Sequence, residues 1–127
     1  MGMSDNDGLN GRRVLVVEDE MMIAMLVEDM LGDLGCSVVG PAHGLQAAMT
    51  LAEESTDLDA ALLDVNLAGQ PVFPVADVLR ARNVPIIFCT GYGDAGLREA
   101  DRGAPVLQKP YRARDLAETL ATALKVA

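Results

Sequence analysis

The chain has 127 residues, of which 50% are hydrophobic and only 3% aromatic, so it is long enough for one domain with an aliphatic core. Its formal net charge of −9 argues against direct binding of nucleic acid, which requires clustered lysine and arginine side chains. No apolar stretch approaches the roughly 20 residues that cross a bilayer, and the N-terminus lacks the basic and apolar regions of a signal peptide. We therefore expect a cytoplasmic protein that contacts neither nucleic acid nor membrane.

The pattern along the chain alternates between two types of segment. Residues 1–11 are polar and contain glycine, and we expect a flexible lead-in to a single domain spanning residues 12–127. Short apolar, β-branched runs predict strands, and apolar residues at helical spacing predict helices. The predicted strands are 13–18, 36–40, 60–64, 86–89 and 106–108, and the predicted helices are 21–34, 45–54, 74–81 and 112–125.

The connections between these elements complete the predicted fold. Residues 66–71 are expected to form a turn, and the glycine-rich residues 91–103 a polar segment with a short helical stretch near Leu97. Five strands that alternate with helices predict an α/β fold with a doubly wound parallel sheet. Right-handed crossovers then place helices on both faces of that sheet.

Four of the predicted strands end in residues that can hold a cation or a phosphate. The first strand runs into Glu18 and Asp19, and the third ends in Asp64. The fourth runs into Thr90, and the fifth into Lys109. Ligands of open parallel sheets bind beyond the carboxyl ends of the strands, so we expect these side chains to converge at one edge.

This convergence decides between two common strand orders. In the order 3-2-1-4-5, strand 2 would separate Asp19 from Asp64 by roughly 10 Å, too far for both to bind one ion. In the order 2-1-3-4-5, Asp64 is central, with Asp19 on one side and Thr90 on the other. We therefore predict a five-stranded sheet of order 2-1-3-4-5.

The acidic residues at this edge predict a metal site. Two carboxylates about 5 Å apart repel each other by about 3 kcal/mol at an effective dielectric constant of 20. A divalent cation removes this repulsion, and carboxylates with a turn carbonyl form the hard oxygen site that suits Mg²⁺. The alternative is that Glu18, Asp19 and Glu20 merely open the first helix, where acids interact favourably with the helix dipole.

Together these residues resemble the receiver domain of two-component response regulators, over about residues 12–126. Four segments carry the resemblance, namely 16–20, 63–67, 89–91 and 108–111. The resemblance implies a flavodoxin-like receiver fold. The segment 85–92 is also similar to the Phe-Ala-Thr-Gly signature of a receiver branch found as single-domain regulators in alphaproteobacteria, with Cys89 in place of the alanine.

The resemblance implies a role for each site residue. Asp64 would accept a phosphoryl group from a sensor histidine kinase or a histidine phosphotransfer protein. The magnesium ligands would be the carboxylates of Glu18, Asp19 and Asp64 and the main-chain carbonyl of Asn66. Thr90 and Lys109 would each contact a phosphoryl oxygen, and the Lys109–Pro110 peptide bond would be cis. The protein would assist its own phosphorylation and dephosphorylation without being a metabolic enzyme.

The chain departs from the family pattern at Val106, where many receivers carry a tyrosine or phenylalanine that turns inward on activation. We expect a stand-alone receiver without an output domain, which signals through protein contact or acts as a phosphate relay or sink. The alternative is a receiver domain cut from a longer regulator. The downstream target is not readable from the sequence. The expected contact face lies around residues 91–107 and the last helix, where Arg98, Arg102, Arg112 and Arg114 cluster in sequence.

Two other functions remain open from the sequence. A Mg²⁺-dependent phosphohydrolase with an aspartyl-phosphate intermediate would need Asp-x-Asp after the first strand and a cap domain. The chain instead carries Glu18-Asp19-Glu20 and has no room for a cap. A receiver fold that serves only as a docking module would leave Asp64 unphosphorylated.

Overall fold

A computed structural model of the chain describes residues 7–91 and 96–125. Its strands are β1 (Arg13–Val17), β2 (Ser37–Ala42), β3 (Ala60–Asp64), β4 (Asn66–Leu67), β5 (Gln70–Pro71), β6 (Ile86–Thr90) and β7 (Val106–Gln108). Its α-helices are α1 (Met21–Asp33), α2 (Leu45–Glu54), α3 (Phe73–Ala81) and α4 (Ala113–Ala123), and two 3₁₀ turns, η1 (Asp7–Leu9) and η2 (Glu99–Asp101), complete the fold.

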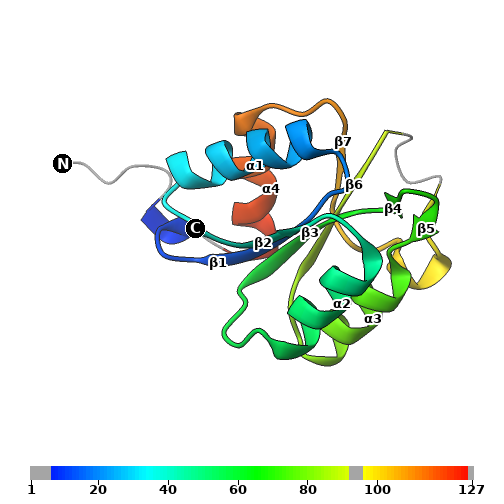
Figure 1. The fold of residues 1–127 in the computed structure, drawn as a ribbon. Helices are drawn as coiled ribbons and strands as arrows, with labels where there is room; N and C mark the ends of the chain where they lie inside the picture. Colours follow the sequence, from blue (N-terminus) through cyan, green and yellow to red (C-terminus); the bar gives the residue numbers. More distant parts are fainter. Residues whose placement is uncertain (1–6, 92–95, 126–127) are drawn as a thin grey trace.

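The main sheet has five parallel strands in the order β2-β1-β3-β6-β7. Numbered along the chain, this is the order 2-1-3-4-5, so the predicted topology is confirmed. Helices α1 and α4 cover one face of the sheet, and α2 and α3 cover the other (Figure 1). The doubly wound α/β fold class is confirmed with it.

Alternation along each strand divides the core into two layers. Leu15 and Val17 of β1 pack on the α2–α3 side, whereas Val14 and Val16 pack on the α1–α4 side. The three central strands are buried on both faces, which explains why they read in the sequence as nearly continuous apolar runs. The side chains that carry chemistry are therefore confined to the strand ends.

The last part of the segment 1–11, which the sequence predicts to be a flexible lead-in, is instead packed against the domain. Leu9 lies in turn η1 and is fully buried in the α1–α4 layer. The amide of Gly11 also donates to the carbonyl of Gly35, at 2.8 Å. A single apolar side chain anchors this segment, and one residue gives no periodic pattern. Residues 1–6 lie outside the described part of the chain.

Two further connections differ from prediction. The turn predicted over 66–71 is a small antiparallel hairpin of β4 and β5. Its tip residues, Ala68 and Gly69, have φ angles of 51° and 90°, as in the two-residue turns that suit the twist of a hairpin. The helical stretch predicted near Leu97 is reduced to the single turn η2, with Leu97 itself buried before it.

Helix α1 exposes an apolar surface near its N-terminus. Met21, Met22, Met25 and Leu26 are all more than half exposed. The helices within the described ranges are too short or too polar for any of them to cross a bilayer. We call the four exposed side chains Met21, Met22, Met25 and Leu26 the α1 apolar patch.

Truncating a buried leucine should destabilise the fold more than truncating an exposed one. Leu116 of α4 is fully buried, whereas Leu26 of α1 is 56% exposed. Leu116→Ala should lower the free energy of unfolding by about 3 kcal/mol, because it removes buried surface and leaves a cavity. Leu26→Ala should lower it by less than about 1 kcal/mol. Urea denaturation measures both, and equal losses would contradict this assignment of the core.

Candidate functional site

Four side chains meet at the carboxyl edge of the sheet, each brought there by a different strand. Asp64 is the last residue of β3, Thr90 is the last of β6, Glu18 directly follows β1, and Lys109 directly follows β7. Glu18, Asp64 and Thr90 are 3%, 7% and 5% exposed. The convergence predicted from the sequence is thus present, and three of these side chains are buried while Lys109 is partly buried.

Lys109 neutralises part of the acidic cluster. Its Nζ lies 2.7 Å from Oε1 of Glu18 and 3.3 Å from Oδ2 of Asp64. Burial alone would lower the pKa of Lys109, but the hydrogen bond with Glu18 and the charge of Asp64 outweigh it, so the pKa is raised. Its backbone amide donates to the carbonyl of Thr90 at 2.8 Å, which fixes the backbone position from which the lysine side chain extends. Lys109 is therefore a charged, positioned counterion.

The three acids are not equivalent. Burial, together with hydrogen bonding to Glu18 and Asp19, raises the pKa of Asp64 to about 7. Burial would also raise the pKa of Asp19, but hydrogen bonds from Asp64 and from the amide of Ala68 outweigh it and lower the pKa. Without a bound cation, Asp64 therefore holds a proton more tightly than Asp19 does.

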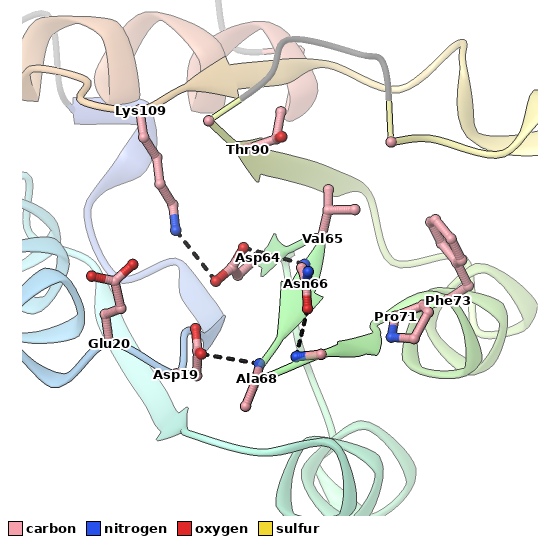
Figure 2. A pocket seen from close by; sticks show the side chains of 13 residues that line it. Asp19, Glu20, Asp64, Val65, Asn66, Ala68, Pro71, Phe73, Thr90 and Lys109 are labelled. Carbon is pink, nitrogen blue, oxygen red and sulfur yellow. Dashed lines mark hydrogen bonds and ion pairs between the residues drawn. The ribbon is translucent and has the colours of Figure 1, made fainter.

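The β4–β5 hairpin is tied directly to these acids. The amide of Ala68 donates to Oδ2 of Asp19 at 3.0 Å, and the amide of Asn66 lies 3.4 Å from Oδ1 of Asp64. The side chain of Asn66 accepts from the amide of Gly69 at 2.8 Å and so closes the hairpin tip (Figure 2). The hairpin therefore forms one wall of the site.

The donor set fits a hard divalent cation. Glu18, Asp19 and Asp64 each offer one carboxylate oxygen, and these three atoms lie within 4.8 Å of one another. Carboxylate oxygens gathered this closely suit Mg²⁺. Burial and the hydrogen bonds with Glu18 and Asp19 raise the pKa of Asp64 despite the opposing charge of Lys109. The additional ligand predicted from the carbonyl of Asn66 stays a prediction.

The site opens into a pocket of about 630 Å³ that extends well beyond the acids. Figure 2 shows Pro71 and Phe73 on the opposite side of this pocket from Asp19 and Lys109. Gly96 also lines it. Sequence analysis missed these three wall residues because none is ionisable. The hairpin turn was the one sequence signal pointing to this side of the pocket.

A second, mostly apolar hollow of about 330 Å³ adjoins the first. Glu20 and Lys109 line both hollows, and Leu26 of the α1 apolar patch lines the second. The remaining lining residues are Ile23, Val27, Met30, Pro110 and Tyr111. The α1 apolar patch is therefore continuous with the acidic site.

Other expectations at the site have definite outcomes. The Lys109–Pro110 peptide bond is cis, as the family resemblance implied. Val106 is half-buried against the α2–α3 layer, so the inward-turning aromatic residue of many receivers has no counterpart at this position. Cys89 is buried, and burial raises its thiol pKa to about 12, so it stays protonated. Tyr92, the last residue of the segment 85–92 that is similar to the Phe-Ala-Thr-Gly signature, lies outside the described residues.

Comparison with known proteins gives a consistent result. The family profile described as "Response regulator receiver domain" matches residues 14–121. Among curated proteins, the chain is 32% identical over 114 residues to the phyllosphere-induced regulator PhyR of Methylorubrum extorquens, a match that covers 87% of this chain and 43% of PhyR. The chain spans about half the length of the curated relatives it matches.

Two solved structures are informative. The solution structure of SdrG from Sphingomonas melonis Fr1 is 41% identical with a TM-score of 0.80, and the match covers 98% of this chain and 100% of SdrG. The receiver domain of sensor histidine kinase PA1611 from Pseudomonas aeruginosa PAO1 is 27% identical with a TM-score of 0.75, covering 91% and 98%. That crystal structure has a magnesium ion coordinated in its active site cleft.

The raised pKa of Asp64 predicts a pH-dependent effect on stability. The pKa of Asp64 is about 7 in the folded protein, above the ordinary value of 3.8, so ionising this carboxyl destabilises the folded state. The loss of stability begins near pH 4, increases with pH and is complete above about pH 7. With EDTA present, Asp64→Asn should therefore stabilise the protein by about 2 kcal/mol near pH 8 and much less near pH 5.

Urea denaturation at the two pH values measures this difference. The matched control is Asp33→Asn, which removes the same charge from an exposed position on α1. A gain in stability that is equal for the two variants would attribute the effect to net charge and contradict the assigned pKa of Asp64.

Proposed function

This chain belongs to the response regulator receiver domain family, and we propose that Asp64 is its phosphoacceptor. The single observation that carries the proposal is the placement of Asp64, which ends the central strand between two further acids and Lys109. Phosphoryl transfer depends mainly on positioning and charge neutralisation, and this edge of the sheet supplies both.

The proposed reaction is a simple displacement at phosphorus. A carboxylate oxygen of Asp64 attacks the phosphorus atom of a phosphohistidine on the donor protein. The new O–P bond forms as the P–N bond breaks, and the electron pair of that bond leaves with the imidazole nitrogen. Asp64 must be ionised to act as the nucleophile, so the groups that set its pKa also set the fraction of reactive protein.

Glu18, Asp19 and Asp64 would hold Mg²⁺, with the carbonyl of Asn66 as a further ligand. When bound, the ion would neutralise negative charge on the acids and on the phosphoryl oxygens. Lys109 already reaches Asp64 and would pair with a phosphoryl oxygen once the carboxylate is esterified. Thr90 lines the same pocket and would donate a hydrogen bond to another phosphoryl oxygen.

The α1 apolar patch supports a protein as the phosphodonor. It begins directly after Glu20, which lines the phosphoacceptor pocket, and the apolar hollow joins the two. Exposed apolar surface of this kind marks protein contacts. A sensor histidine kinase or a histidine phosphotransfer protein that covers this patch would bring its histidine to the pocket. The phosphorylated domain would then act on a protein target or pass the phosphoryl group on.

Incubation with acetyl phosphate and Mg²⁺ tests the proposal. We expect the intact mass to increase by one phosphoryl group, and we expect alkali to remove the adduct, because an acyl phosphate is labile to base. Asp64→Asn should abolish the gain, since an amide cannot form an acyl phosphate. Asp59→Asn is the matched control, because Asp59 pairs with Arg12 away from the pocket.

The same measurement separates the alternatives. Continuous turnover of a phosphomonoester such as p-nitrophenyl phosphate would favour a phosphohydrolase. No mass gain in the wild-type chain, with either acetyl phosphate or phosphoramidate, would favour a docking module and end the proposal for Asp64.

Lys109→Ala should leave Mg²⁺ binding intact and reduce the structural response to phosphorylation. Removing a cation from the acidic cluster makes its potential more negative, so Mg²⁺ should bind at least as tightly as in the wild type. The change in NMR spectrum on phosphorylation should shrink, because Lys109 can no longer follow the phosphoryl oxygen. Titration calorimetry measures the first effect, and a loss of Mg²⁺ binding would contradict the role assigned to Lys109.

A further inference from the structure

An ion-pair network ties η2 to α3 at the outer wall of the pocket. Asp101 of η2 is fully buried, and its carboxylate lies 2.6 Å from Nε of Arg98 and 2.7 Å from Nη2 of Arg80. Arg98 also holds Asp77 of α3 through two contacts, at 2.8 and 3.2 Å. We call these four residues the Arg98 clamp.

Arg98 makes a third contact that involves the pocket itself. Its guanidinium carbon lies 4.6 Å from the centre of the Phe73 ring, a cation–π geometry. The planar guanidinium can bridge two carboxylates while it stacks on an aromatic face, which a lysine ammonium cannot do. Burial would raise the pKa of Asp101, but the two arginines outweigh it and lower the pKa, so the carboxylate stays charged.

The clamp holds two residues of the pocket wall. Phe73 and Gly96 both line the pocket. Phe73 lies on the side away from the acids (Figure 2). Gly96 lies against Val65, where an added Cβ would come within 3.4 Å of the valine Cγ1. Arg98 follows Gly96 by two residues and lies over Phe73, so its position constrains both.

Little else fastens this wall. Over residues 96–104, Leu97 and Asp101 are the buried side chains, and Glu99, Ala100 and Arg102 are exposed. The apolar anchors are thus Leu97, which is buried, and Ala104, which is only partly buried. Ion pairs from Arg98 and Asp101 add the attachments to Asp77 and Arg80 of α3. The position of this wall therefore depends strongly on Arg98, whereas an ordinary helix is held mainly by the packing of its apolar face.

We propose that Arg98 is a positioning residue for phosphoryl transfer. It holds Phe73 and Gly96 so that they bound the space next to Asp64 into which the non-reacting part of a phosphodonor extends. The inference rests on the proposed function of Asp64. The sequence places Arg98 with three other arginines in a predicted contact face. In the structure its guanidinium instead binds Asp77 and Asp101 and stacks on Phe73.

Arg98→Met tests the clamp in the full chain, because it keeps the side-chain length and removes both ion pairs. Hydrogen exchange is measured first, without any phosphodonor, at the amides of Asp101 and Ala104, which donate to the carbonyls of Arg98 and Asp101. We expect exchange at these amides to become roughly tenfold faster. The matched control, Arg102→Met, changes an exposed arginine of the same segment and should leave exchange within about twofold.

Phosphorylation kinetics with acetyl phosphate at saturating Mg²⁺ then test positioning. For Arg98→Met we expect the KM for the donor to increase about fivefold with kcat within about twofold, because the acids and Lys109 are untouched. Arg98→Lys should give an intermediate KM, since it keeps the charge without the bridge. Asp77→Asn removes the exposed carboxylate and leaves the Arg80–Asp101 pair intact, so it gives a smaller change in the same direction even if Arg98→Met fails to fold.

Faster exchange with unchanged KM would overturn the positioning role and leave the clamp purely structural. Unchanged exchange would show that the clamp does not hold the wall, which also overturns the proposal. A wild-type protein that accepts no phosphoryl group would overturn the proposed function and the role of Arg98 with it, so the two failures are distinguishable.

Discussion

The crowding of three carboxylates at one edge of the sheet is the constraint around which this molecule is arranged. Asp64 ends the central strand, and the strand spacing of about 4.8 Å brings it close to Glu18 and Asp19, which follow β1. Their repulsion is tolerated because Lys109 reaches in from β7, with its amide fixed to the carbonyl of Thr90. The β4–β5 hairpin adds a backbone donor to Asp19. The sheet order, the hairpin and the lysine therefore form one electrostatic arrangement.

The sequence predicted the strands, the helices and the acidic site well because each depends on local pattern. Strands that are buried on both faces appear in the sequence as apolar runs. Polar residues occur at the ends of these runs, and Asp64 and Thr90 are the last residues of β3 and β6. The strand order followed from chemistry: only one common order brings Asp64 next to Asp19. The sheet has that order, and the roles of these residues in phosphoryl transfer stay predictions.

What sequence reasoning missed depends on contacts between distant residues. Leu9 is one apolar residue in a polar segment, so its burial had no signal. Asp101 reads as an ordinary surface acid, because its partner Arg80 is remote in sequence and lies on another element. Phe73 and Gly96 line the pocket without ionisable groups, and a search for chemistry passes over such residues. The acids of the site could therefore be predicted, and the wall that faces them could not.

The exposed start of α1 has a practical consequence for spectroscopy. Met21, Met22 and Met25 carry their terminal methyl groups in solvent, on the first turns of a helix that begins directly after the acidic segment. Side chains exposed in this way reorient within nanoseconds, so their methyl resonances should be sharp. Selective ¹³C labelling of methionine would place three reporters beside the pocket, sensitive to a partner that covers the helix, without any change to the sequence.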